Sequence, residues 1–163
     1  MKKLAFIIAA VVAVAAFTGC TKEYNTYIDG AQVLSYEYDI TPAMWKRVRG
    51  ANLPGGYNYL YASFENSDIT RDVVDFGTVT AEIWNIYDQA NNLGSWNPLP
   101  YVYPLELNEL DDNGNHIIVA ENIRFEWEQG MVTFVIQDLD GLEPVDLSST
   151  ITIKVNVIRN IRY

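Results

Sequence analysis

The segment Ile151-Thr-Ile-Lys-Val-Asn-Val157 decides the fold class, because its side chains alternate strictly between apolar and polar. The apolar series is Ile151, Ile153, Val155 and Val157. A period of two places this series on one face of an extended strand and the polar series on the other. Such a strand is typical of an antiparallel sheet that buries one face and leaves the other in water.

The same alternation recurs along most of the chain from Ala31 onward. Turn sequences rich in Gly, Pro, Asn and Asp separate the segments, and Glu128-Gln-Gly130 is the best candidate for a hairpin. Pro104 interrupts one segment and marks it as an edge strand. The other segments that we expect to be strands are Val33–Ile40, Tyr57–Phe64, Thr78–Ile86, Tyr101–Leu107, Ile117–Val119, Ile123–Trp127 and Val132–Ile136.

These segments predict an all-β fold, an immunoglobulin-like antiparallel β-sandwich of about seven to eight strands, in one domain over residues 31–163. Little helix is expected. Thr41-Pro42 favours a short helical turn that runs through Val48, with Pro at the first helical position. Ser67-Asp68 favours a second one, capped at its start and ended by Gly77.

The first 20 residues have the pattern of an export signal. Lys2 and Lys3 precede an apolar run from Leu4 to Phe17, and Thr18-Gly19-Cys20 follows it. The run is shorter than the about 20 residues that a spanning helix needs. We therefore expect residues 1–19 to be a signal peptide, with an ordinary secretory signal as the alternative to a lipoprotein signal.

Thr18-Gly19-Cys20 resembles the lipobox of bacterial lipoproteins. That resemblance implies cleavage before Cys20, a diacylglycerol on its thiol and attachment to a membrane through the lipid. Residues 20–30 would then form a lipidated tether. In enterobacteria an Asp directly after the lipidated cysteine retains such proteins at the inner membrane, and this chain has Thr21 at that position. The resemblance therefore favours the outer membrane, and it leaves open on which side of that membrane the domain lies.

Four segments resemble uncharacterised small cell-envelope lipoproteins of Bacteroidota with a C-terminal β-sandwich domain. They are Phe76–Trp84, Trp96–Tyr101, Gly130–Asp138 and Ile151–Val157. Many of those proteins carry a collagen-like segment after the lipidated cysteine, and this chain has none. The resemblance implies a location and a fold, and it implies no activity.

Charge excludes one large class of partners. The chain has 11 Lys and Arg against 21 Asp and Glu, for a net charge of −10. Removal of residues 1–19 takes away Lys2 and Lys3 and leaves a net charge of −12. An acidic surface repels nucleic acid and gains nothing from anionic lipid, so we expect no nucleic-acid partner.

Residues for nucleophilic catalysis or metal binding are scarce. The chain has one histidine, His116, and one cysteine, Cys20, so a His/Cys zinc site is excluded by number. His116 is the only histidine base for a Ser-His-Asp or Cys-His arrangement, and its position beside the Asp111–Asn115 turn favours a surface residue at the start of a strand. The turn Asp111–Asn115 departs from the calcium-loop pattern, since Gly114 comes before the position where the pattern needs a Gly and Asn122 stands where a Glu is needed. We predict no enzyme, no catalytic residues, no cofactor and no metal, although six acidic residues leave carboxylate pairs open: Glu106, Glu109, Asp111, Asp112, Glu126 and Glu128.

Aromatic residues are the remaining candidates for a binding site. One hypothesis is a platform that stacks against sugar rings, made of Tyr57, Tyr59, Tyr61, Trp96, Tyr101 and Tyr103. The alternative is that these side chains form cross-strand pairs that stabilise the sheet. Trp84 and Trp127 have aliphatic neighbours on their strands and are expected in the core.

The sequence thus predicts a non-enzymatic, outer-membrane-anchored lipoprotein that acts as a binding or structural module. One alternative is a glycan-binding accessory protein that uses the aromatic face. A second is a pilus-like or envelope assembly subunit that pairs through an exposed edge strand. A small hydrolase is a third.

Overall fold

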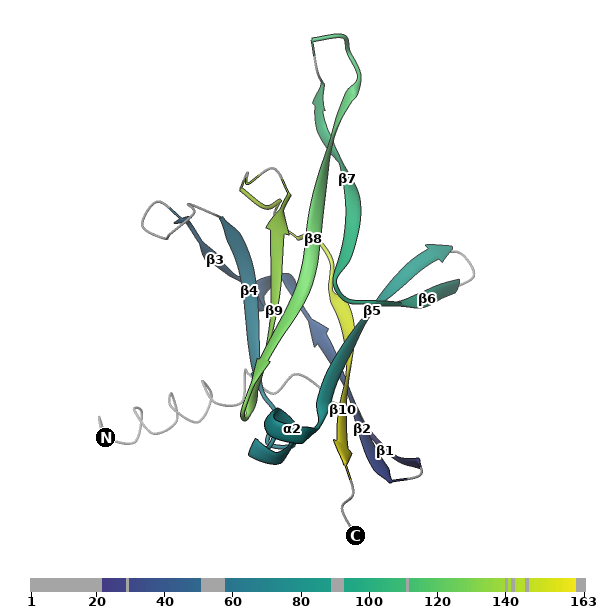
Figure 1. Ribbon diagram of the computed structural model, residues 1–163. Coiled ribbons are helices and arrows are strands. Elements are labelled where there is room, and N and C mark those ends of the chain that lie inside the picture. Colours follow the sequence, from purple (N-terminus) through teal and green to yellow (C-terminus); the bar gives the residue numbers. More distant parts are fainter. Residues whose placement is uncertain are drawn as a thin grey trace, which may run out of the picture.

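The computed structural model describes residues 22–28, 30–50, 58–88, 93–110, 112–139, 141, 143–145 and 147–160. Within these residues the chain forms ten strands, one α-helix and one 3₁₀ helix, arranged around two five-stranded sheets (Figure 1). Sheet 1 has the spatial order β1 (Lys22–Ile28), β2 (Ala31–Ile40), β10 (Ile151–Asn160), β5 (Thr78–Asp88) and β6 (Leu93–Pro98). Sheet 2 has the order β3 (Lys46–Val48), β4 (Tyr59–Glu65), β9 (Met131–Asp138), β8 (His116–Glu128) and β7 (Tyr101–Leu110).

All neighbouring strands are antiparallel, and the prediction of an all-β sandwich with little helix is confirmed. The strands number ten, more than the seven to eight expected. Ile117–Val119 and Ile123–Trp127 are parts of one long strand, β8, whereas β1, β3 and β6 were not expected. All three lie at the edge of a sheet, β1 and β6 in sheet 1 and β3 in sheet 2. An edge strand has a neighbouring strand on one side only, so the backbone N–H and C=O groups on its other side have no partner strand.

The core lies between the two central strands, β10 and β9. Ile153, Val155 and Val157 of β10 have no exposed surface, as the alternation of this segment predicts. Phe134 of β9 is also fully buried, and its ring lies 5.7 Å from the ring of Tyr38. Inward-facing residues of both sheets thus interdigitate in a single apolar layer.

The β7–β8 hairpin extends beyond the rest of the sandwich (Figure 1). Pro104 lies in β7, which is an edge strand of sheet 2, as its ring predicts. Near the end of the hairpin the side chains of Leu110 and Ile118 are 58% and 68% exposed.

Both predicted helical turns exist, with different bounds. The first is a 3₁₀ helix, η1 (Pro42–Met44), which begins at the proline but gives way to β3. The second is α2 (Arg71–Phe76), which Thr70 caps, because its side-chain oxygen accepts a hydrogen bond from the N–H of Val73. The cap expected at Ser67-Asp68 was therefore wrong. Gly77 ends α2 as predicted, and a Cβ there would lie 2.5 Å from the carbonyl oxygen of Ile158.

The structure corrects the prediction that residues 20–30 form a tether. Residues 22–28 form β1, which pairs with β2 along its whole length, from Lys22 opposite Glu37 to Ile28 opposite Ala31. Gly30 makes the hairpin turn with a φ of +74°, a conformation that glycine adopts without strain. The folded domain therefore begins at Lys22 and not at Ala31. No helix in the described part of the chain is long and apolar enough to cross a membrane.

Candidate functional site

The structure divides the expected aromatic platform among three places. Tyr59 and Tyr61 lie on β4 in sheet 2, Trp96 lies on β6 in sheet 1, and Tyr101 and Tyr103 belong to β7. Tyr57 and Cys20 lie outside the described residues. A single platform made of all six rings is therefore wrong, because the five described members occupy the outer faces of opposite sheets and the interior.

Tyr101 and Tyr103 face inward and pack against the core. The hydroxyl of Tyr103 donates a hydrogen bond of 2.7 Å to Glu121, whose side chain is completely buried. The other carboxylate oxygen of Glu121 accepts a bond of 2.6 Å from the backbone N–H of Val145. Glu121 thus ties β7 and the segment before β10 to β8, which is a structural role.

A second buried acid, Asp138, lies directly opposite Glu121 on β9 and is 2% exposed. Neither acid was among the six carboxylates considered from the sequence. A signal for Glu121 existed, because it occupies an inward position two residues before Ile123. Among the acids considered, Glu126 and Glu128 are exposed on β8, so they do not line an enclosed cleft.

Trp96 pairs with Trp84 on the outer face of sheet 1. The two residues are directly opposite on β6 and β5, with ring centroids 5.2 Å apart. The core position expected for Trp84 was wrong: Ile83 is buried, so the next residue points to the other face. Trp84 lies over Gly94, where an added Cβ would come within 2.6 Å of the indole ring. Trp127, in contrast, packs against the core as expected.

Lys154 of β10 covers part of this tryptophan pair. Its ammonium nitrogen lies 4.2 Å from the centroid of Trp96 and 2.6 Å from a carboxylate oxygen of Glu82. All these groups are partly buried, which strengthens both the cation–π contact and the ion pair relative to fully hydrated groups.

Tyr59 and Tyr61 lie side by side on the outer face of sheet 2, with ring centroids 6.2 Å apart. Tyr61 lies directly opposite Val135 on β9, and Gln137 follows Val135 by two residues on the same face. The amide oxygen of Gln137 accepts a 3.0 Å hydrogen bond from Arg124 of β8. Val135 is only 3% exposed although it points outward, so the side chains around it form a closely packed surface.

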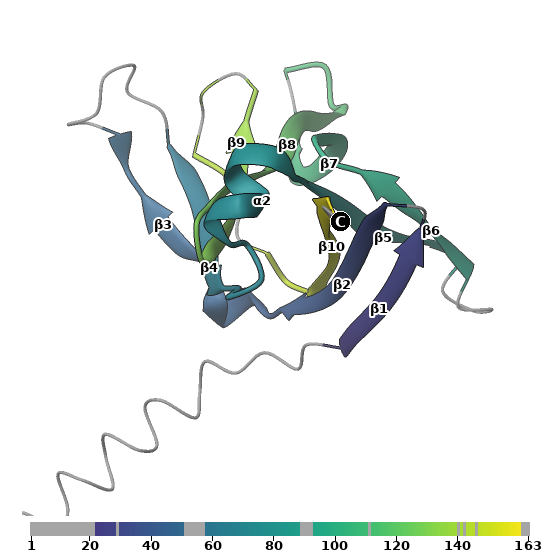
Figure 2. The ribbon, with the colours of Figure 1, turned by 60° about the horizontal axis from the view of Figure 1, so that its bottom comes forward.

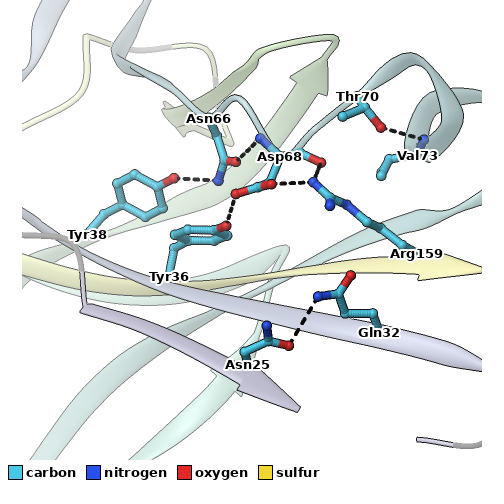
Figure 3. A network of polar contacts seen from close by, with 9 residues as sticks. All are labelled: Asn25, Gln32, Tyr36, Tyr38, Asn66, Asp68, Thr70, Val73 and Arg159. Atoms are coloured by element: carbon cyan, nitrogen blue, oxygen red, sulfur yellow. Dashed lines mark hydrogen bonds and ion pairs between the residues drawn. The ribbon is translucent and has the colours of Figure 1, made fainter. Parts of the chain in front are cut away.

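A polar network closes the sandwich at the end that carries α2 (Figure 3). Asp68 accepts hydrogen bonds from the hydroxyl of Tyr36 on β2 and from the guanidinium of Arg159 on β10. Arg159 also donates to the backbone oxygen of Asp68 at 2.9 Å. Asn66 accepts a bond from the N–H of Asp68 and donates one of 2.9 Å to the hydroxyl of Tyr38.

The network joins the two sheets. Tyr36, Tyr38 and Arg159 belong to sheet 1, whereas Asn66 and Asp68 follow β4 of sheet 2. Burial raises the pKa of the Tyr38 hydroxyl, and the charge of Asp68 raises it further, although the bond from Asn66 opposes the shift. Tyr38 therefore stays protonated, and its phenol is not a base or a nucleophile at neutral pH.

The remaining predicted features stay at the surface. His116 is the exposed first residue of β8. Asp112 to Asn115 are exposed in the turn after β7, while Asp111 lies outside the described residues. In the portion of the chain that the structure describes, no group of three or more His, Cys, Asp and Glu residues is placed to hold a metal ion.

The chain matches no protein-family model, no curated protein and no solved structure in the three comparisons made. The resemblance to Bacteroidota lipoproteins therefore stays a prediction.

We predict that the protein loses stability in alkali, because the pKa values of two tyrosine phenols are raised in the folded state. Burial, and secondly the bond to Glu121, raises the pKa of Tyr103, and the pKa of Tyr38 is also raised. In the unfolded chain both phenols ionise near the ordinary value of 10.0, so only the unfolded state loses these protons as the pH rises above that value. The contribution of the two phenols to the free energy of unfolding is therefore complete below this pH. Above it, the free energy of unfolding falls by up to about 1.4 kcal/mol per pH unit for each phenol.

Urea unfolding between pH 8 and pH 11, about the range in which tyrosine ionises, measures this effect. The slope of unfolding free energy against pH should become shallower in Tyr38→Phe and in Tyr103→Phe. Tyr24→Phe, at a side chain that is 54% exposed, is the control and should keep the wild-type slope. Equal slopes in all four proteins would contradict the prediction.

Proposed function

We propose that this chain is an outer-membrane lipoprotein, anchored through a lipid on Cys20, whose folded domain is a non-enzymatic binding or structural module. The observation that carries the proposal is the N-terminal sequence: two lysines, an apolar run from Leu4 to Phe17, and Cys20 directly after Gly19. Two or more acyl chains on one cysteine would give stable attachment.

The domain supports the non-enzymatic part of this proposal. The carboxylate of Glu121, which is fully buried, accepts hydrogen bonds from the half-buried phenol of Tyr103 and from the backbone N–H of Val145. Asp68 likewise uses both carboxylate oxygens, one for Tyr36 and one for Arg159. Acids and phenols engaged in this way stabilise the fold and are not free to accept a proton from a substrate.

Metabolic labelling with palmitate tests the anchor. The wild-type chain should incorporate the label and sediment with the outer membrane, whereas Cys20→Ala should do neither. Thr21→Ala is the matched control and should be labelled like the wild type. Absence of label in the wild type, or label that persists in Cys20→Ala, would refute lipidation at Cys20.

Binding of a glycan is the second candidate function, and the paired rings of Tyr59 and Tyr61 favour it. They share the outer face of sheet 2 with Gln137, Arg124 and Lys46, and the ammonium nitrogen of Lys46 lies 5.7 Å from the centroid of Tyr61. Aromatic rings that share a surface with amide and cationic groups are suited to the apolar faces and hydroxyl groups of a sugar.

Titration calorimetry with a panel of polysaccharides tests this candidate. Loss of an aromatic contact costs up to about 1.5 kcal/mol, so Tyr61→Ala should weaken binding by up to about tenfold. Trp96→Ala changes a ring on the opposite sheet and is the matched control. Absence of binding to the whole panel, or equal affinity of Tyr61→Ala and wild type, would refute the candidate.

A further inference from the structure

The point at which the chain joins sheet 1 is fixed close to the proposed lipid. Only Thr21 separates Cys20 from Lys22, the first residue of β1. Two extended residues span at most about 7 Å. Since β1 is an edge strand of sheet 1, a lipid on Cys20 would hold this edge within about that distance of the bilayer surface.

The opposite edge of sheet 1 lies level with this point. A single row of cross-strand partners crosses all five strands: Lys22, Glu37, Lys154, Glu82 and Pro98. Four strand spacings make the row about 19 Å wide. Trp96 precedes Pro98 by two residues on β6 and faces outward with Trp84. β1 and β6 border the same sheet (Figure 2).

The outer face of sheet 1 has the chemistry of a membrane interface. Trp84, Trp96 and Tyr24 combine a large apolar ring with a polar group, which is the combination favoured at the boundary between lipid and water. Tyr24 is 54% exposed on β1, near the anchored edge. Between the edges, Lys154 and Glu82 neutralise each other at 2.6 Å, which lowers the cost of bringing their charges near lipid.

We propose that the outer face of sheet 1 lies on the bilayer surface, with the lipid at one edge and the Trp84–Trp96 pair in the headgroup layer at the other. This inference rests on the proposed lipidation of Cys20. Because the two sheets have their outer faces on opposite sides of the sandwich, the Tyr59–Tyr61 face is then directed away from the membrane. The acidic chain has no electrostatic preference for anionic lipid, so a zwitterionic surface suffices.

Tryptophan fluorescence in vesicles tests the proposal. The full lipidated protein is reconstituted into phosphatidylcholine vesicles with and without bromine on the acyl chains, and flotation of the vesicles confirms attachment. Brominated lipid should reduce the emission of the wild type. That reduction should be largely lost in Trp84→Phe combined with Trp96→Phe. Trp127→Phe is the matched control at an inward-facing ring and should keep the reduction.

The outcomes separate the two proposals. Flotation without any quenching would overturn the membrane-facing surface and leave the lipid anchor intact. Quenching that survives the loss of Trp84 and Trp96 would overturn it too, because another tryptophan would then face the lipid. Failure to float, together with absence of palmitate label, would refute the anchor and this inference with it. Each variant is first checked for a cooperative urea transition, and if the double variant is unfolded, the single Trp96→Phe protein is used in its place.

Discussion

The hydrogen bonds of Asp68 are the interactions on which the arrangement of the two sheets depends. Its carboxylate, which follows a strand of sheet 2, bonds to Tyr36 and Arg159 on two neighbouring strands of sheet 1. The same turn is fixed to the β8–β9 hairpin, because Asn66 donates its N–H to Gly130 at 2.9 Å and Gly130 donates to Ile69 at 2.8 Å. The turn after β4 is thus bonded to β2 and β10 of sheet 1 and to the β8–β9 hairpin of sheet 2. It closes this end of the apolar layer between the two sheets.

Because side chains fill the interior of the sandwich, the aromatic pairs that could contact a ligand lie on the outer faces of the two sheets. Tyr103 and Glu121 occupy the interior and bond to each other, so they add to stability. The paired rings that remain, Trp84 with Trp96 and Tyr59 with Tyr61, point to opposite sides of the molecule. A chain anchored at the edge of sheet 1 can therefore present one aromatic face to lipid and the other to a partner.

Strict alternation made the central strands predictable from sequence, as in β10, where burial of one face requires every second residue to be apolar. The strands β1, β3 and β6 were missed because none of their described side chains is buried, so their sequences need no strict alternation of apolar and polar residues. The outward position of Trp84 could have been predicted from the sequence, because Trp84 directly follows Ile83, which faces inward. The Asp68 network could not be predicted, because its partners lie 32 and 91 residues away and only the folded topology brings them together.

A double-mutant cycle on Asp68 and Tyr36 tests the central claim most directly, with the free energy of unfolding measured in urea. Asp68→Ala should lower stability by about 1.5–3 kcal/mol, since it removes charge-assisted bonds to both Tyr36 and Arg159. In a Tyr36→Phe background the loss should be smaller by at least about 0.5 kcal/mol, because the two residues interact. Asp75→Ala, which breaks an exposed ion pair with Arg71 within α2, should cost less than about 0.5 kcal/mol. Equal costs for Asp68→Ala and Asp75→Ala, or strict additivity with Tyr36→Phe, would contradict the claim that Asp68 joins the two sheets.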